Sequence, residues 1–382
     1  MSAPAVIPRG TIFRADDITF WAGKEHGRPL DAALDEADLL VSTPHGGSAM
    51  PEEVLEFIVP TYTRRLQFDY TDCTTAPICR RWAEIDARII YVENPHPRLI
   101  RDPNRARPVD AEAALREAIL RVHAAGPGER VDLTGVDAIR PVSFSFQPVF
   151  VISDDETELA RLTSAFAEAA SRGLEVYEST RDHLRDEMIA RALARSAAGA
   201  AGPRNVWHLS FHDTMNTTTT PDGAVTVARK PEDELPRIVA LSNRGDRDGE
   251  PRGADPVVTM PPADVRALAD AHRTGFDAAK PDDVQLNKPY LGSQEIIESG
   301  RAFDARREDA RSLGVRLGAV QAEFRREFLL GPAATAELHR AGTDWPALDP
   351  HHVNEIAQAC RMSWEAFRQA AASDAGSGEP HR

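Results

Sequence analysis

Short apolar runs alternate with long stretches rich in Ala, Arg and Glu along this chain. The apolar runs predict β-strands at 38–42, 87–93, 147–153, 205–211, 237–242 and 316–323. Several of these runs are nearly continuous, as expected for a sheet that is covered on both faces. The longer stretches predict helices at 74–85, 111–125, 156–198 (with a break near Gly173), 263–279 and 352–372. This alternation favours an α/β fold in which helices flank a mixed central sheet.

The length of the chain favours one composite domain. A chain of 382 residues can form one large domain or two medium ones, and this one shows no internal repeat. We expect a single α/β domain over residues 1–372. Within it, residues 154–202 are expected to form a helical insertion, and the polar residues 373–382 a disordered tail.

Composition and charge argue against several classes of partner. The net charge of −15 disfavours nucleic acid, because affinity for a phosphate backbone comes mainly from clustered Lys and Arg. No apolar run reaches 18 residues, and the first residues lack the layout of a signal peptide, so we expect no membrane partner. Cys73, Cys79 and Cys360 are too few for a disulfide framework, which favours a reducing, cytoplasmic location.

The first candidate for chemistry is His45. The predicted strand 38–42 leads directly into this histidine, which is flanked by Pro44 and by Gly46 and Gly47. Ligand sites in α/β sheets lie at the carboxyl ends of strands, and glycine lets the backbone approach another group closely. His45 could therefore coordinate a metal or polarise a carbonyl; the alternative is a loop histidine that bonds to its own turn.

Two aspartates, Asp69 and Asp72, precede the predicted helix 74–85. An aspartate in this position is most often an N-cap, whose carboxylate accepts hydrogen bonds from the first turn of the helix. It can also serve as an oxygen ligand of zinc. Both interpretations are open on the sequence alone.

Arginines are concentrated after the predicted strand 87–93. Arg98, Arg101 and Arg105 fall within eight residues, around Asp102 and Asn104. One interpretation is a structural cluster of salt bridges. The other is an anion clamp, since arginine holds carboxylates through two parallel hydrogen bonds.

The predicted strand 205–211 brings histidines to one face of the sheet. Alternation places His208, Ser210 and His212 on the same side. His212 lies at the end of the strand and is the better ligand candidate, whereas His208 is deeper and is expected to be structural.

Glu323 lies among apolar residues at the end of the predicted strand 316–323. A buried carboxylate is costly unless it faces a cation, a proton or a metal-bound water. An exposed, alternating glutamate is the alternative. Together, two histidines, a carboxylate, an arginine cluster and this glutamate are the components of a hydrolytic zinc site: three protein ligands, an open water position and a general base.

These segments, in this order, resemble the N-formylglutamate amidohydrolase family, whose fold is related to the zinc carboxypeptidases. The family's signatures are similar to Pro44-His45-Gly46-Gly47…Pro51, Thr71-Asp72, Arg98…Asp102-Pro103-Asn104-Arg105, Phe211-His212-Asp213-Thr214-Met215 and Gln321-Ala322-Glu323 followed by Arg325 or Arg326. The resemblance extends, with interruptions, from Asp38 to Leu330. It implies a zinc-carboxypeptidase or phosphorylase/hydrolase-like fold.

By this resemblance, Zn²⁺ is the cofactor, and His45, Asp72 and His212 are its ligands. Asp69 is the alternative carboxylate ligand. One His-Asp-His set implies a single ion.

The resemblance also assigns the remaining roles. Glu323 would take a proton from the attacking water and pass it to the leaving amine. Asn104 and Arg105 would bind the substrate carboxylate. Arg98 would help to hold this carboxylate or would polarise the scissile carbonyl.

The implied partner is a small N-acyl amino acid with a carboxylate, such as N-formylglutamate. Two features depart from the family pattern: Asp213 replaces a serine after His212, and extra length lies in 108–202 and after Leu330. Insertions of this kind reshape substrate pockets. The alternatives are therefore a related amide or peptide hydrolase of specialised metabolism and a non-catalytic carboxylate-binding protein on the same fold.

Overall fold

The computed structural model describes residues 5–126, 128–151, 155–253 and 257–376, except for the side chains of Asp69 and of residues 372–376. Its centre is a mixed sheet, seven-stranded in the described residues, with the order β10-β9-β11-β6-β3-β5-β2. These strands are β2 Thr19–Phe20, β3 Leu39–Thr43, β5 Ile89–Glu93, β6 Asn205–Thr214, β9 Val239–Ser242, β10 Val284–Leu286 and β11 Arg316–Arg325. The expected α/β class with a mixed central sheet is confirmed.

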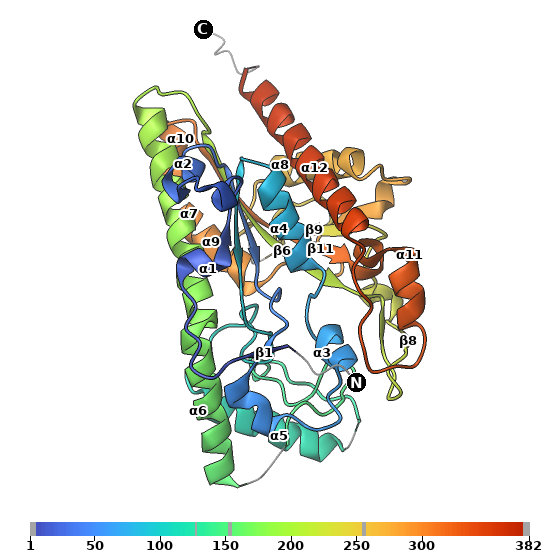
Figure 1. The fold of residues 1–382 in the computed structure, drawn as a ribbon. Helices are drawn as coiled ribbons and strands as arrows, with labels where there is room; N and C mark the ends of the chain where they lie inside the picture. Colours follow the sequence, from blue (N-terminus) through green and yellow to red (C-terminus); the bar gives the residue numbers. More distant parts are fainter. Residues whose placement is uncertain (1–4, 127, 152–154, 254–256, 377–382) are drawn as a thin grey trace.

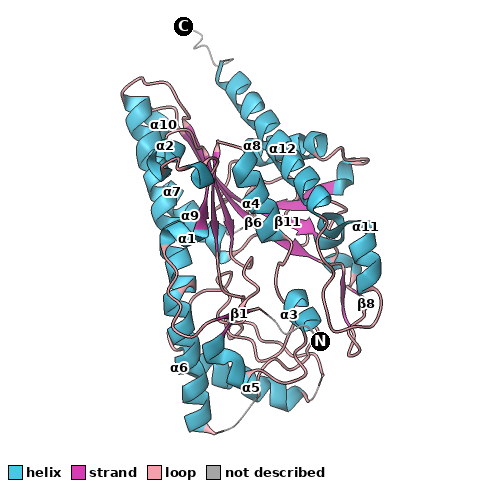
Figure 2. Ribbon diagram, in the orientation of Figure 1, coloured by secondary structure: helices cyan, strands magenta, loops and turns pink. Residues whose placement is uncertain are grey.

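Helices cover both faces of the sheet (Figures 1 and 2). On one face lie α4 Thr75–Ile85, α8 Pro262–Gly275 and α12 Pro350–Gly376; on the other lie α7 Leu174–Ala197 and α9 Gln294–Asp304. Every residue of β3 and β5 is buried, because successive side chains point into two different apolar layers. The nearly continuous apolar runs of the sequence have this physical cause.

Shorter elements complete the chain. The remaining helices are α1 Ala15–Ile18, α2 Leu30–Leu34, α3 Arg64–Asp69, α5 Ala111–Ala125, α6 Glu156–Arg172, α10 Arg307–Ser312 and α11 Arg326–Leu338, with 3₁₀ turns at Lys24–His26, Glu52–Phe57, Pro231–Asp233 and Pro281–Asp283. The strands outside the central sheet pair as β1 Val6–Ile7 with β4 Met50–Pro51 and as β7 Thr217–Thr219 with β8 Val225–Ala228.

The break predicted near Gly173 is confirmed. Helix α6 ends at Arg172 and α7 begins at Leu174. A Cβ atom at position 173 would lie 2.5 Å from the ring of His96, so glycine is needed where the helix pair meets the loop after β5. The break therefore fits the insertion against the loop that carries the arginine cluster.

The predicted strand 147–153 is wrong. Its described part forms only isolated bridges, Val142 with Pro148 and Ile58 with Phe150, outside the central sheet. Residues 152–153 lie outside the described part of the chain. Pro148 has no N–H to donate, which disfavours a position in a regular ladder.

At the C-terminus, α12 continues to Gly376, four residues into the expected tail, and residues 377–382 lie outside the described part. Among the described helices, none combines the length and the apolar character needed to cross a membrane.

Strand direction places the candidate residues together. Strands β11, β6, β3 and β5 are parallel to one another, so their carboxyl ends share one edge of the sheet. The β11–β6 register pairs Glu323 with His212, and the loops after β3 and β5 carry His45 and the arginine cluster. Ligands of α/β folds bind at this edge.

Candidate active site

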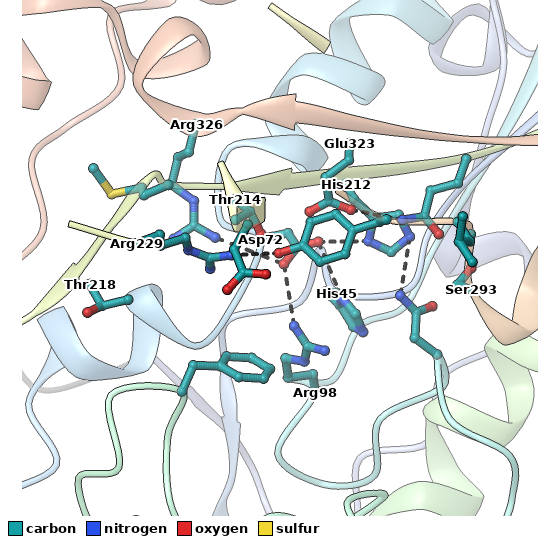
Figure 3. A pocket seen from close by; sticks show the side chains of 18 of the residues that line it. His45, Asp72, Arg98, His212, Thr214, Thr218, Arg229, Ser293, Glu323 and Arg326 are labelled. Carbon is teal, nitrogen blue, oxygen red and sulfur yellow. Dashed lines mark hydrogen bonds and ion pairs between the residues drawn. The ribbon is translucent and has the colours of Figure 1, made fainter. Parts of the chain in front are cut away.

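A cavity of about 410 Å³ opens at the carboxyl edge of the sheet (Figure 3). All the residues that were assigned to a site from the sequence line it: His45, Asp72, Arg98, Asn104, Arg105, His212 and Glu323. They come from five separate segments of the chain. The fold therefore brings the predicted set into one place.

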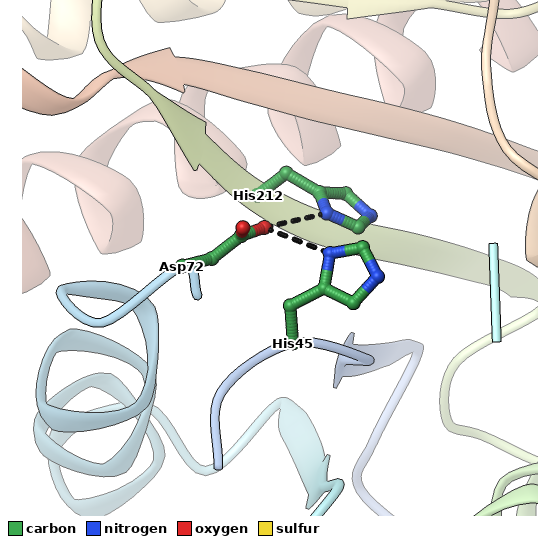
Figure 4. Close-up of side chains that lie close together, drawn as sticks. All are labelled: His45, Asp72 and His212. Carbon is green, nitrogen blue, oxygen red and sulfur yellow. Dashed lines mark hydrogen bonds and ion pairs between the residues drawn. The ribbon is translucent and has the colours of Figure 1, made fainter. Parts of the chain in front are cut away.

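The side chains of His45, Asp72 and His212 converge on one point (Figure 4). Nδ1 of His45 lies 3.2 Å and Nδ1 of His212 lies 2.9 Å from the same Asp72 Oδ2 atom. All three residues are buried, and one potential ligand atom from each lies within 4.8 Å of the others. This group could hold a metal ion.

The partners of the second nitrogen, Nε2, of each imidazole ring explain this orientation. Nε2 of His45 lies 2.8 Å from Asp102 Oδ1, and Nε2 of His212 lies 2.9 Å from Ser210 Oγ. If each Nε2–H is donated to these oxygens, both Nδ1 lone pairs face the Asp72 carboxylate. Such lone pairs and a carboxylate repel one another unless a cation or a proton lies between them, so the donor set fits a metal.

The electrostatics of the group favour an anionic Asp72. When protons rather than a metal lie between the three groups, burial raises the pKa of the Asp72 carboxyl, but the positive charge of His45 and hydrogen bonds from both histidines outweigh burial and hold the pKa well below its ordinary value. For Glu323, burial is the dominant cause and raises the pKa, while His212 opposes this shift. The pKa values of Asp72 and Glu323 are thus shifted in opposite directions, as in acid–base sites where one carboxyl stays ionised and another exchanges protons.

Asp72 is not the N-cap of helix α4. Thr74 occupies the N-cap position, and the Asp72 side chain points into the cavity. The Asp72 carboxylate therefore does not cap helix α4, which was the main alternative to metal binding. The side chain of Asp69, the other candidate, lies outside the described part of the structure.

Glycine in the loop after β3 serves a packing purpose. A Cβ at Gly47 would lie 2.5 Å from the carbonyl of Pro95, in the loop after β5. The two loops that carry His45 and the arginine cluster can approach closely only because position 47 has no side chain.

Arg326 and Asp213 clamp the segment that carries Asp72. The Arg326 guanidinium is buried, pairs with Asp213, and donates to the carbonyls of Phe68 (2.9 Å) and Thr71 (2.7 Å). Asp213 also accepts from the Thr74 backbone N–H at 3.1 Å. Asp213 thus anchors this arginine, and Arg326, rather than Arg325, lines the cavity.

Asp213→Asn should destabilise the metal-free protein by about 3–5 kcal/mol, because it leaves the buried Arg326 cation with only the more distant Asp72 carboxylate, at 3.9 Å, as a counter-charge. Urea unfolding of the metal-free protein measures this loss. The double variant Asp213→Asn/Arg326→Met removes both charges and should recover most of it. An unchanged urea midpoint in the single variant would contradict the clamp.

The three arginines after β5 are all paired with carboxylates. Arg98 binds Asp102, Arg101 binds Glu178 away from the cavity, and Arg105 binds Asp137 at 2.6 Å. Arg98 is almost buried, and its guanidinium lies 4.8 Å from the Phe144 ring centroid. The cluster is therefore a salt-bridge network, of which Arg98 and Arg105 still reach the cavity.

Sequence reasoning missed Arg229 and Tyr290. Nη1 of Arg229 donates to the Tyr290 hydroxyl at 2.6 Å, and its Nε is buried without a hydrogen-bond partner. Among the cavity arginines of the described residues, only Arg229 forms no ion pair with a carboxylate. A single arginine in a polar loop and a tyrosine after Pro289 carry no sequence signal.

His208 lies deeper than the cavity, as expected. Its Nε2 lies 2.8 Å from Ser42 Oγ, and its Nδ1 lies 2.7 Å from Ser299 Oγ. Burial lowers its pKa to about 3, so this ring is neutral.

The family model described as N-formylglutamate amidohydrolase matches residues 37–330, a span that includes every predicted site residue. No curated protein and no solved structure matches the chain.

Proposed function

Because the chain belongs to the N-formylglutamate amidohydrolase family, we propose that it is a zinc-dependent amidohydrolase. Its substrate is the N-formyl or other short N-acyl amide of an amino acid that carries a carboxylate, such as N-formylglutamate. The observation that carries this proposal is the convergence of His45 Nδ1, Asp72 Oδ2 and His212 Nδ1 inside a buried cavity.

Two imidazole nitrogens and one carboxylate oxygen are the donor set of many catalytic zinc sites, in which three protein ligands leave a position open. Zinc, when bound, supplies the Lewis acidity that activates water and polarises the acyl carbonyl. No serine or cysteine nucleophile is then required.

Glu323 is proposed as the general base. It lies beside His212 in the sheet register, and Gln321 Nε2 donates to its Oε2 at 2.9 Å. Glu323 removes a proton from the attacking water as the new C–O bond forms. It then gives this proton to the amide nitrogen as the C–N bond breaks, so the products are a carboxylic acid, formate in the simplest case, and a free amine.

Arg98 is proposed to stabilise the developing oxyanion or to hold a carboxylate. Its guanidinium is held between Asp102, with which it pairs, and the ring of Phe144. A fixed cation in a partly desolvated cavity acts on charge that develops in the transition state without reorganisation.

The substrate carboxylate has two sets of proposed partners. Asn104 and Arg105 form the pair implied by the family resemblance, and Asn104 Oδ1 is buried without a partner. Arg229 and Tyr290 form a second set, in which the cation is not neutralised by a protein carboxylate. A substrate with two carboxylates can engage both sets.

The fold and domain organisation complete the proposal. A mixed sheet with the site at the carboxyl ends of its parallel strands supports a zinc-carboxypeptidase-like fold. Helix α7, from the segment 154–202, packs on β3, β5 and β6, which supports one composite domain over 1–372 with an integrated helical insertion.

Arg229→Met should lower kcat/KM for a carboxylate substrate by about 10- to 100-fold, since it removes hydrogen bonds from a charged donor. Steady-state kinetics with the substrate and with its neutral carboxamide analogue measure this effect, which should be confined to the carboxylate. Lys230→Met is the matched control, because it removes the neighbouring charge on an exposed side chain. Equal losses on both compounds would remove Arg229 from carboxylate binding.

Release of formate from N-formylglutamate, with and without a chelator, tests the proposed function. A related amide or peptide hydrolase would bind zinc without releasing formate. A carboxylate-binding protein would bind the substrate without turnover.

A further inference from the structure

A fully buried carboxylate, Glu295 of α9, lies beneath the cavity. It accepts hydrogen bonds from Arg181 Nη1 at 2.7 Å, Tyr177 OH at 2.5 Å, Ser210 Oγ at 2.7 Å and Ser42 Oγ at 2.9 Å. A charge in such a place is tolerated because each donor compensates for the lost solvation. Glu295 thus joins α7 and α9 to the two central strands of the sheet.

Glu295 acts as an acceptor in this cluster. Burial alone would raise the pKa of its carboxyl, but the Arg181 guanidinium and the hydrogen-bond donors outweigh burial and bring the pKa to about 2. The deprotonated carboxylate has no hydrogen to donate. Ser210, whose hydroxyl has a single hydrogen, therefore donates that hydrogen to Glu295 Oε2.

The direction of the Ser210–Glu295 hydrogen bond determines which nitrogen of His212 carries a hydrogen. Because the Ser210 hydrogen is committed to Glu295, its oxygen can only accept from His212 Nε2, which lies 2.9 Å away. His212 must then carry a hydrogen on Nε2, so that its neutral ring presents the Nδ1 lone pair toward Asp72, the residue that Nδ1 faces in Figure 4. Asn104 Nδ2 lies 3.5 Å from the same Nε2, too far to compete with Ser210.

We propose that Glu295, acting through Ser210, is a positioning residue that fixes the Nε2–H tautomer and the ring orientation of His212. The proposal rests on the proposed function, since it takes His45, Asp72 and His212 as the metal ligands. By this assignment the two histidines are held differently. His45 is held directly by Asp102, whereas His212 is held by a buried glutamate through one serine hydroxyl.

The fold offers a matched control in Ser42. Its hydroxyl donates to the same Glu295 Oε2 atom, it is as buried as Ser210, and its oxygen faces a histidine, His208, at 2.8 Å. His208 does not line the cavity. Ser42→Ala and Ser210→Ala therefore remove equivalent hydroxyls from one carboxylate, but only the second breaks the connection to a proposed metal ligand.

The test measures Zn²⁺ affinity of the full-length, metal-free chain by competition with a chelating indicator. Ser210→Ala should weaken binding by about 10- to 100-fold, the usual effect of removing a partner of a ligating histidine, and Ser42→Ala should leave it unchanged. The Co²⁺-loaded protein should show an altered visible absorption spectrum in Ser210→Ala alone. Urea unfolding of both metal-free variants controls for stability, which a purely structural role would lower equally in both.

Unchanged Zn²⁺ affinity in Ser210→Ala would overturn the positioning role, as would equal losses of affinity in the two variants. A wild-type chain that binds no Zn²⁺ would overturn the proposed function as well. The wild-type titration thus separates the two failures.

Discussion

Glu323→Gln is expected to lower kcat by about 10²- to 10⁴-fold, the usual contribution of a general acid–base residue. The amide keeps the size of the side chain and can still accept a hydrogen bond from Gln321, so the local structure should persist. It cannot take a proton from water at neutral pH. Glu323 supplies none of the ligand atoms, which come from His45, Asp72 and His212, so the variant should retain its zinc.

Zinc content and steady-state turnover of the purified variant, measured side by side, check this expectation. Retained zinc with lost turnover assigns Glu323 to proton transfer. Loss of both would instead place Glu323 among the groups that hold the metal. A fully active variant would remove Glu323 from the mechanism.

The expected elements were found where periodicity is strong and local. Helix α5 has the predicted bounds, and α6 and α7 meet at the predicted break. Strands β6 and β11 run beyond their predicted ends, to Thr214 and Arg325, because each continues to hydrogen-bond with the other. Inter-strand pairing of this kind is not visible in a single run of sequence.

Much of the candidate site was accessible from the sequence because, apart from Asp72 between α3 and α4, its residues lie at or after strands that end at one edge of the sheet. His45, Arg98 and Glu323 each lie at or just beyond a strand, inside a motif. What a motif could not decide was the direction of a side chain. Arg101 belongs to the same cluster as Arg98, yet it turns away to Glu178.

The supporting groups could not be predicted in the same way. Glu295 accepts hydrogen bonds from Ser42, which lies 253 positions earlier in the sequence, and from Tyr177, which lies 118 positions earlier. Charged residues on helices are ordinarily exposed, so Glu295 and Arg181 carry no local sign of burial. Their roles depend on tertiary packing of α7 and α9 against the sheet, which only the folded structure shows.

Removal of the metal is expected to abolish turnover, and added Zn²⁺ to restore it. The purified chain should contain about one zinc ion, since the described residues offer one buried His-Asp-His group. Without the ion, the attacking water keeps its ordinary, very high pKa, and the developing oxyanion is not stabilised by a metal charge. Elemental analysis and a formate-release assay on N-formylglutamate, before and after treatment with a chelator, measure both effects.

Each outcome of this experiment bears on a different part of the proposal. Chelator-sensitive release of formate, recovered with Zn²⁺, would support the family's activity in this chain and give its substrate. Zinc without formate release would keep the metal site and direct the search to other N-acyl carboxylates, for which Arg105 and Arg229 in the cavity remain the guide. A chain that neither contains zinc nor takes it up would contradict catalysis, because Asp72 and the two imidazole rings would then require protons in place of a metal. His45 and His212 would in that case hold charged hydrogen bonds to Asp72, and the cavity would serve to bind a carboxylate ligand.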